Sequence, residues 1–221
     1  METFLLVLAA LFSVINPPGT ALVFLSMTKY ASSATRRALA RRVASNSFFV
    51  MTGSLLIGAL ILKIYGISVP VLRVAGGFVV AASGWKLLNE GTPTTTADAP
   101  AQSQRVDYTN LAFYPLTLPL TTGPGTIAVM ISLGISRSAY SNYAEDFQFF
   151  VASLLAAVVM AAAIYVCFAY SDRVERMLGS SGTDIAVRLS AFILFCLGIQ
   201  IIWTGASDLL ASVHLQAVPV K

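Results

Sequence analysis

Long runs of apolar residues, separated by shorter polar stretches, dominate the chain. Six of these runs hold about 20 residues each, the length that an α-helix needs to cross a bilayer. The pattern therefore predicts an all-α polytopic membrane protein. Its spans are expected near residues 3–28, 43–64, 70–89, 110–133, 148–170 and 186–211.

The composition agrees with this class. Hydrophobic residues make up 57% of the sequence and charged residues only 11%, whereas a soluble domain carries about 25% charged residues. The net charge of +4 would suggest a nucleic-acid partner in a soluble chain. Here the basic residues cluster in the connection from Lys29 to Arg42, which indicates contact with the lipid bilayer and no nucleic-acid partner. The start Met1-Glu2-Thr3 lacks the basic region of a signal peptide, so the first run is expected to be retained.

Lys and Arg are distributed unevenly between the two sides that these spans define. One side collects ten of them, and the other collects Lys63, Arg73, Arg137 and Lys221. The side richer in Lys and Arg normally faces the cytoplasm. The sequence therefore predicts a multi-pass protein of the bacterial inner membrane with both termini in the periplasm.

Two of the predicted spans are interrupted at their centres. The first contains Asn16-Pro17-Pro18-Gly19-Thr20, and the fourth contains Thr122-Gly123-Pro124-Gly125-Thr126. The segments Pro18–Thr20 and Pro124–Thr126 match at an offset of 106 residues. Proline removes a backbone donor and its ring clashes with the preceding turn. Helices 1 and 4 are therefore predicted to break at mid-membrane.

The matching breaks predict an internal repeat. Residues 1–89 and 110–221 each hold three predicted spans, and a flexible cytoplasmic linker at 90–109 joins them. Because three is an odd number, the second repeat enters the membrane from the opposite side. Inverted repeats of this kind are common among secondary transporters. A looser echo relates Gly66–Arg73 to Gly182–Leu189.

Each break creates two helix ends with opposite electrostatic character. The N–H groups at a half-helix N-terminus suit a carboxylate, and the carbonyls at a half-helix C-terminus suit an ammonium group or a coupling cation. A zwitterion needs both. We therefore predict a substrate site at the breaks, with polar side chains adding hydrogen bonds and glycines allowing close approach. The predicted substrate-binding residues are Asn16, Pro17, Pro18, Gly19, Thr20, Thr122, Gly123, Pro124, Gly125 and Thr126.

Several of these features also have structural interpretations. The breaks can be proline kinks that shape packing, with Thr and Asn bonding to freed carbonyls. Arg73 and Arg188 either gate or bind anions, or extend to the membrane interface. Polar residues that either line a pathway or bond between helices are Asn46, Ser47, Thr52, Ser83 and Gln200. Small residues predicted to lie at packing contacts are Gly53, Gly58, Gly76, Gly77 and Gly84.

The acidic residues and the histidine lie outside the centres of the spans. No Asp or Glu is deep in a predicted span, and the single histidine, His214, lies in the C-terminal tail. A buried proton relay, a metal site and a catalytic triad therefore have no candidate residues. The chain is not expected to be an enzyme or to hold a cofactor. A coupling cation, either sodium or a proton, remains open.

Three motifs resemble the MarC family of bacterial and archaeal inner-membrane proteins. They are Asn16-Pro17-Pro18-Gly19 followed by Phe24–Thr28, the segment Gly66–Gly77, and the segment Tyr114–Ile127. They occur in the family's order, and the resemblance covers nearly the whole chain. Asn16, Pro17 and Gly19 match the family's Asn-Pro-x-Gly pattern, whereas Pro18 adds a second lost donor to this break.

The resemblance implies a function. Some archaeal relatives are described as carriers of small neutral amino acids such as glycine and alanine, and the family is grouped with amino-acid exporters of the lysine-exporter type. We therefore expect a secondary transporter of a small neutral solute that works by alternating access. The alternatives are a non-transporting membrane protein that binds a lipid or protein partner, and an intramembrane enzyme, for which the sequence offers no base, nucleophile pair or metal cluster. Glycine-rich helix faces are also compatible with a homo-oligomer.

Overall fold

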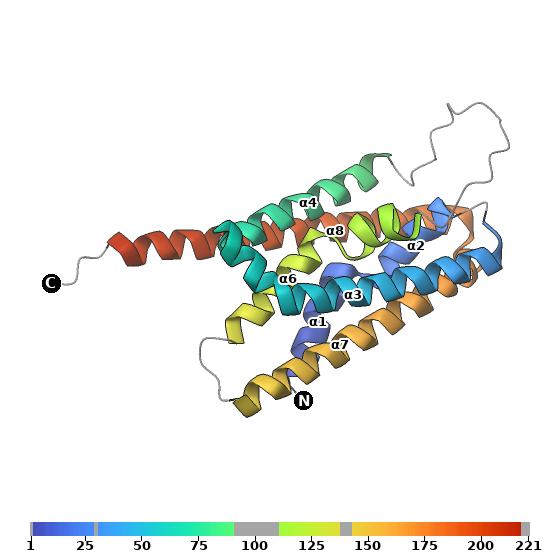
Figure 1. Ribbon diagram of the computed structural model, residues 1–221. Coiled ribbons are helices and arrows are strands. Elements are labelled where there is room, and N and C mark those ends of the chain that lie inside the picture. Colours follow the sequence, from blue (N-terminus) through green and yellow to red (C-terminus); the bar gives the residue numbers. More distant parts are fainter. Residues whose placement is uncertain (1, 29–30, 91–110, 138–142, 218–221) are drawn as a thin grey trace.

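The computed structural model describes residues 2–28, 31–90, 111–137 and 143–217, which form helices and no strand (Figure 1). The predicted linker at 90–109 lies outside the described residues, except for Glu90 at the end of the fourth helix. The helices are α1 (Glu2–Ile15), α2 (Pro17–Met27), α3 (Ser33–Tyr65), α4 (Val69–Glu90), the π-helical η1 (Ala112–Thr121), α6 (Pro124–Arg137), α7 (Tyr143–Ala169) and α8 (Ser171–Ala217).

Five stretches of the described chain are long and apolar enough to cross a membrane. They are Glu2–Leu25, Ser33–Tyr65, Val69–Asn89, Asp146–Ala169 and Ile185–Ser212. They correspond to the first, second, third, fifth and sixth predicted spans. The fourth predicted span, 110–133, differs because it is divided between η1 and α6. Only its second part, Pro124–Ile135, is a regular apolar helix.

The connection before α3 is shorter than the sequence suggested. The helix begins at Ser33 instead of near residue 43, so most of the basic cluster lies on a helix. Ser32 caps this start, because its Oγ accepts a hydrogen bond of 3.1 Å from the Thr35 N–H. The helix ends at Tyr65 and is followed by Gly66, whose φ of 64° is the left-handed conformation that glycine adopts readily after a helix C-terminus.

The connection predicted at 171–184 is largely helical as well. α8 begins at Ser171, directly after α7, and bends at Gly179, where φ is 69° and ψ is 176°. Glycine tolerates this conformation because it has no Cβ. α8 therefore consists of a short first segment and a long second segment.

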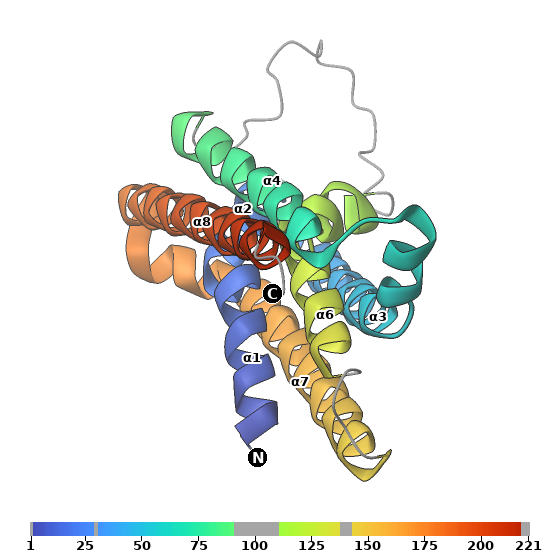
Figure 2. The same cartoon turned by 90° about the vertical axis from the view of Figure 1, so that its left-hand side faces the viewer.

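The helices form three layers (Figures 1 and 2). α4 packs against α8 on one side, α3 packs against α7 on the other, and the elements of the two broken spans lie between these pairs. α1 and α2 contact α7, and α2 also contacts α8. η1 and α6 contact α3, and α6 also contacts α4. The breaks are thus held in the middle of the molecule by long helices on both sides.

Close packing inside the bundle contrasts with an apolar outer surface. Phe24 of α2 stacks on Phe168 of α7, with ring centroids 4.5 Å apart, and both side chains are fully buried. Large apolar side chains such as Phe49, Phe78 and Trp203 point outward and are more than half exposed. This distribution suits a protein whose solvent is hydrocarbon.

Glycines allow α4 and α8 to approach closely. A Cβ at Gly84 would lie 2.5 Å from the Phe195 backbone nitrogen, and a Cβ at Gly198 would lie 2.3 Å from the Ala81 nitrogen. The packing role predicted for Gly58, Gly76, Gly77 and Gly84 is confirmed, because added Cβ atoms would meet Ile131, Pro124, Ile202 and Phe195 respectively. At Gly53 the prediction is wrong, because no atom lies within 4 Å of an added Cβ.

The substitution Gly84→Val should destabilise the protein by forcing α4 away from α8. Overpacking of this kind costs about 1–3 kcal/mol, so the thermal unfolding midpoint of the purified protein in detergent should fall by several degrees. Gly53→Val makes the same change where space is open and should leave the midpoint nearly unchanged. Equal midpoints for the two variants would contradict the close α4–α8 contact.

Candidate functional site

The first break is a sharp turn centred on Asn16, between α1 and α2. Its φ of 45° and ψ of 64° lie in the left-handed region, which asparagine tolerates better than most residues with a side chain. The Asn16 Oδ1 accepts a hydrogen bond of 3.4 Å from the Gly19 N–H and thereby caps α2. Pro17 and Pro18 occupy the first turn of α2, where a missing N–H costs least.

Other predicted residues at this break also support the turn. The Thr20 hydroxyl donates to the carbonyls of Asn16 at 3.1 Å and Pro17 at 3.3 Å. The space beside Gly19 is occupied, because a Cβ there would lie 2.8 Å from the Ser190 Cβ of α8. Asn16 and Thr20 therefore make local hydrogen bonds that support the turn, and Gly19 packs against α8.

The second break is longer and follows from two further prolines. Tyr114 and Leu118 have extended backbones, with φ −124° and ψ 125° at Tyr114 and φ −112° and ψ 126° at Leu118. Each directly precedes a proline, Pro115 or Pro119, which disfavours the α-helical region for the residue before it. η1 is irregular for this reason.

Threonine hydroxyls satisfy carbonyls in this irregular segment. Thr117 donates to the Ala112 carbonyl at 2.6 Å, and Thr121 donates to the Leu116 carbonyl at 2.7 Å. Asn46 of α3 also reaches this segment, since its Nδ2 lies 3.5 Å from the Thr117 Oγ1. These hydroxyls and carbonyls of η1 are thus matched inside the protein, as a membrane interior requires.

The N-terminus of α6 differs from that of α2. α6 begins at Pro124, and the preceding residue, Gly123, has no side chain with which to cap it. The Gly123 carbonyl accepts a hydrogen bond of 3.1 Å from the Ile127 N–H. The N–H groups of Gly125 and Thr126 occupy the helix positions that lack intrahelical acceptors. Of the two half-helix N-termini, α6 therefore offers the better place for an anion.

A cavity of about 70 Å³ lies between the two breaks. A second, of about 10 Å³, is lined by Asn16, Gly19, Thr20, Val23 and Ser190, and it shares Leu87, Leu120 and Leu194 with the first. Three leucines therefore stand between the two cavities. The larger cavity is also lined by Val14, Val79, Val80, Ser83, Thr121, Gly123, Pro124 and Thr126.

The C-terminal end of α1 and the N-terminal end of α6, which have opposite partial charges, meet at the larger cavity. Val14 lies in the last turn of α1, and its carbonyl has no helical donor because residue 18 is a proline. Gly123 and Thr126 line the same cavity at the start of α6. The cavity therefore faces the negative end of one helix dipole and the positive end of another.

Thr122 carries a hydroxyl that the described residues leave unsatisfied. The side chain is fully buried, and its Oγ1 has no hydrogen-bond partner among the described residues. An unpaired buried hydroxyl costs about 1–3 kcal/mol. Thr122 is therefore the predicted side chain with the most obvious capacity to bind a ligand, and Thr126, also buried, lines the adjoining cavity.

The structure places Gly125 against a neighbouring helix. A Cβ at this position would lie 2.5 Å from the Cγ2 of Val80 in α4. Substitution by leucine would consequently disturb helix packing, whatever its effect on a ligand. The isosteric replacement of Thr122 or Thr126 by valine is a cleaner test of binding.

The other polar residues that the sequence analysis considered for a pathway lie in three different environments. Ser83 lines the larger cavity and donates to the Val79 carbonyl at 2.8 Å. Ser47 and Thr52 of α3 have buried hydroxyls without a hydrogen-bond partner among the described residues. Gln200 and Arg188 lie on the exposed surface of α8.

Sequence reasoning missed the residues that α4 and α8 contribute to the cavities. These include Val79, Val80 and Leu87 of α4 and Ser190 and Leu194 of α8. Most are aliphatic, and nothing in the sequence separates them from side chains that face lipid. Among the described residues, no group of three His, Cys, Asp or Glu side chains gathers to hold a metal ion.

The turn at Asn16 generates a testable prediction. Asn16→Ala should destabilise the protein because it removes the cap, at about 1 kcal/mol, and places a side chain without local hydrogen bonds in a left-handed conformation, at about 1–2 kcal/mol. Asn16→Gly removes the same cap but accepts the backbone angles, so it should be clearly milder. The measurement is the unfolding midpoint of each purified variant. A glycine variant as unstable as the alanine variant would contradict the left-handed turn.

Comparison with known proteins places the chain in a family. A model of the "MarC family integral membrane protein" matches residues 1–210. The "UPF0056 inner membrane protein MarC" of Escherichia coli O1:K1 is 32% identical over 94% of this chain and 95% of its own length. Its counterpart in Salmonella typhimurium strain LT2 is 30% identical over the same shares. No solved structure matches the chain. With its multiple apolar helices and inner-membrane relatives, the chain belongs to the MarC family of integral membrane proteins and is a multi-pass inner-membrane protein.

Proposed function

We propose that the protein is a secondary transporter of a small neutral zwitterion of the amino-acid class and that it works by alternating access. The observation that carries the proposal is one cavity bounded by the C-terminal end of α1 and the N-terminal end of α6. In this proposal, η1 and α6 together form the fourth of six spans.

The chemistry of the cavity favours a zwitterion. The N–H groups at the start of α6 suit a carboxylate, and the carbonyls at the end of α1 suit an ammonium group. Thr122 is not itself a lining residue, but its neighbours Thr121 and Gly123 line the larger cavity, and we propose that its hydroxyl turns to the carboxylate when the ligand binds. None of the described residues that line either cavity carries a charged side chain. A ligand with net charge would therefore lack a counter-ion, whereas a zwitterion can be matched by the two helix ends.

The size of the cavity favours a small ligand and a closed conformation. A volume of about 70 Å³ admits a few waters or a solute of a few heavy atoms. Leu87, Leu120 and Leu194 separate this volume from the smaller cavity. Movement of α4 or α8, which supply two of these leucines, would enlarge the site and open it.

The contacts between helices support an inverted repeat with halves 1–89 and 110–221. In such a repeat α1, α2, α3 and α4 would be equivalent to η1, α6, α7 and α8, in that order. The contact between α3 and α6 then has its equivalent in the contact between α7 and α2, and the contact between α4 and α6 has its equivalent in that between α8 and α2. The α3–α7 and α4–α8 contacts each map onto themselves. In this scheme the two breaks occupy equivalent places.

An ion pair holds the two halves together at one end of the molecule. Nη1 of Arg73 in α4 lies 2.5 Å from the Oδ2 of Asp208, near the end of α8. The Arg73 Nε donates to the Ser132 Oγ of α6 at 3.1 Å. Arg73 therefore joins the first half to two helices of the second half.

A second ion pair joins the halves at the other end. Arg36, near the start of α3, pairs with Asp172, near the start of α8. Its Nη2 also donates to the Thr28 carbonyl at 2.8 Å, at the end of α2. Because the two aspartates lie at opposite ends of α8, the two ion pairs close opposite ends of the bundle. Alternating access would require each to open in turn.

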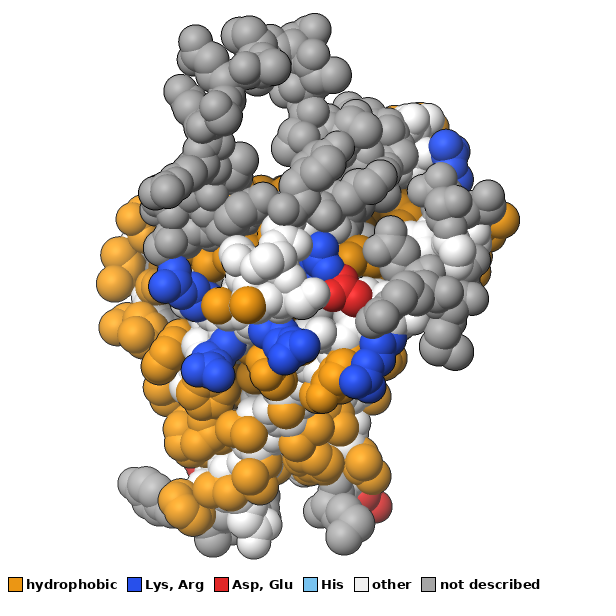
Figure 3. Space-filling view, turned by 90° about the vertical axis from the view of Figure 1, so that its right-hand side faces the viewer, with side chains coloured by type: hydrophobic (Ala, Val, Ile, Leu, Met, Phe, Trp, Pro, Cys, Tyr) orange, Lys and Arg blue, Asp and Glu red, His pale blue; other side chains and the backbone are white. Residues whose placement is uncertain are grey.

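The surface charge supports the orientation proposed for the protein. The end at which α3 and α8 begin carries a gathering of Lys and Arg side chains (Figure 3). Arg37, Arg41 and Arg42 of α3 are exposed there. We assign this end to the cytoplasm and both termini to the periplasm, since positive charge favours the cytoplasmic side.

Transport and stability should respond in opposite directions to Thr122→Val. The substitution removes an unpaired buried hydroxyl, so the ligand-free protein should become more stable by about 1 kcal/mol. Loss of a hydrogen bond to a carboxylate, about 1.5–3 kcal/mol, should weaken glycine or alanine transport about tenfold or more. The measurements are unfolding midpoint and saturable flux of labelled glycine and alanine in liposomes, with sodium and proton gradients varied separately.

Two controls make this experiment decisive. Ser13→Ala removes an exposed hydroxyl that bonds to the Ala9 carbonyl of its own helix, and its flux should equal that of the unchanged protein. Thr126→Val tests, by the same flux measurement, a threonine that lines the larger cavity. Full flux by the Thr122 and Thr126 variants together would remove the proposed site. Absence of flux by the unchanged protein for every zwitterion tried would favour a non-transporting binding protein.

Breaking the Arg73–Asp208 pair should open one end of the bundle. The pair is partly exposed, so it contributes at most about 1 kcal/mol, and Arg73→Gln should raise access to the cavity up to about fivefold. Access is measured as the rate at which a membrane-impermeant maleimide labels Ser83→Cys, with Cys167 and Cys196 replaced. Arg188→Gln, a matched change on the exposed face of α8, should leave the rate unchanged. Equal rates for the two arginine variants would rule out a gating role for Arg73.

A further inference from the structure

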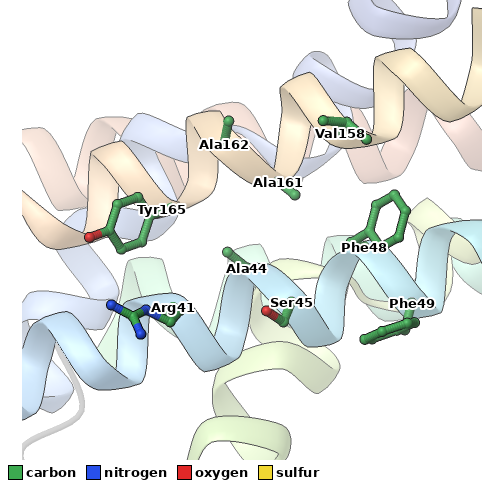
Figure 4. A pocket seen from close by; sticks show the side chains of 9 residues that line it. All are labelled: Arg41, Ala44, Ser45, Phe48, Phe49, Val158, Ala161, Ala162 and Tyr165. Atoms are coloured by element: carbon green, nitrogen blue, oxygen red, sulfur yellow. The ribbon is translucent and has the colours of Figure 1, made fainter.

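A groove lies between α3 and α7, on the side of the bundle away from the breaks. Its volume is about 560 Å³, and it opens outward between the two helices (Figure 4). Small residues form its floor, namely Ala44 and Ser45 of α3 and Ala161 and Ala162 of α7. Because these side chains are short, the antiparallel helices leave a channel that they do not fill.

The groove changes character along its length. Arg41 and Tyr165 lie across from each other at one end, and Phe48, Phe49 and Val158 lie toward the other (Figure 4). Arg41 and Phe48 are seven residues apart on one helix, which corresponds to about 10 Å. A polar mouth therefore leads into an apolar channel of roughly this length.

The polar end coincides with the expected membrane boundary. Arg41 and Arg42 are the last charged residues of α3 before the apolar stretch that begins at Val43 and continues to Leu62. Arginine at such a position normally holds its guanidinium at headgroup level. The apolar end, at Phe48 and Val158, then lies within hydrocarbon. An occupant must consequently be an amphiphile with its polar group at Arg41.

The positive charge at the polar end of the groove favours a lipid with an anionic headgroup. Arg37, Arg41 and Arg42 are exposed on α3, which contains no Asp or Glu. Among the described side chains near this end, the carboxylate of Asp172 is paired with Arg36. On α7, Asp146 lies at the opposite end of the helix from Tyr165. The Arg41 guanidinium is thus available to a phosphate, which it can bind through two parallel hydrogen bonds.

We propose that this groove binds an anionic phospholipid, with its phosphate on Arg41 and Tyr165 and one acyl chain along the small-residue floor between α3 and α7. The site is separate from the zwitterion site proposed above and does not depend on it. Basic pockets between membrane helices are known to recognise anionic headgroups. By the orientation assigned above, the lipid would come from the cytoplasmic leaflet.

The proposal is tested with the full protein in nanodiscs made from mixtures of phosphatidylglycerol and phosphatidylcholine. A phosphatidylglycerol analogue with a photoreactive group in its acyl chain is crosslinked, and labelled peptides are identified by mass spectrometry. Labelling is expected on the peptides that contain Phe48, Phe49 or Val158, and phosphatidylglycerol should compete for it better than phosphatidylcholine. Arg41→Gln should reduce this preference about fivefold, which corresponds to about 1 kcal/mol for one basic residue.

Matched variants distinguish recognition of the headgroup from binding of the acyl chain. Arg37→Gln removes an exposed charge from the same helix outside the groove and should keep the preference. Ala162→Leu places a larger side chain at an exposed position of the groove floor. It should abolish labelling of the groove peptides by the photoreactive lipid, whichever lipid makes up the rest of the nanodisc, because the acyl chain no longer fits. Soluble glycerol phosphate should not compete, because it lacks the acyl chain. Labelling elsewhere, or an equal loss of preference in the Arg37 and Arg41 variants, would overturn the assignment.

Discussion

The structure depends on one constraint: inside a membrane, every backbone group must find its partner within the protein. Prolines at 17, 18, 115, 119 and 124 remove donors from the centres of two spans. Side chains bond to backbone groups at the breaks: Asn16 accepts from the Gly19 N–H at the first, and Thr117 and Thr121 donate to the carbonyls of Ala112 and Leu116 at the second. The long pairs α3–α7 and α4–α8 surround these segments. Broken helices are tolerated at this depth because protein, rather than lipid, lies around them.

The two breaks differ in how fully their polar groups are hydrogen-bonded. At the first, the side chain of Asn16 occupies the acceptor position at the start of α2, and Gly19 packs on Ser190. At the second, Gly123 leaves the start of α6 without a side-chain cap, and the Thr122 hydroxyl has no partner within the described part of the chain. The chain therefore has one tightly closed turn and one that retains hydrogen-bonding capacity. The proposed carboxylate site belongs to the second turn, and the first supplies the carbonyl end of α1.

Much of the fold could be predicted from residue types alone. Apolar runs identify the membrane class, and the matching segments Pro18–Thr20 and Pro124–Thr126 identify the two breaks. The packing role of Gly84 was also predictable, because a glycine in a membrane helix usually marks a close contact. The same reasoning was wrong for Gly53, since the glycine itself does not reveal whether a neighbour faces it. It also placed the start of α3 too late, because charged residues beyond the membrane boundary can continue a helix.

The sequence by itself determined the class, the family and the positions of the breaks, since these follow from hydrophobicity, proline chemistry and local motifs. Only the tertiary structure decided which groups meet. It brought Val14 to the same cavity as Thr126, paired Arg73 with Asp208, and covered Gly125 with Val80. It also revealed Leu87 and Leu194 as cavity residues, although they resemble any lipid-facing leucine in the sequence. The physical reason is that a side chain's environment depends on helix rotation and packing between distant segments, which local patterns do not encode.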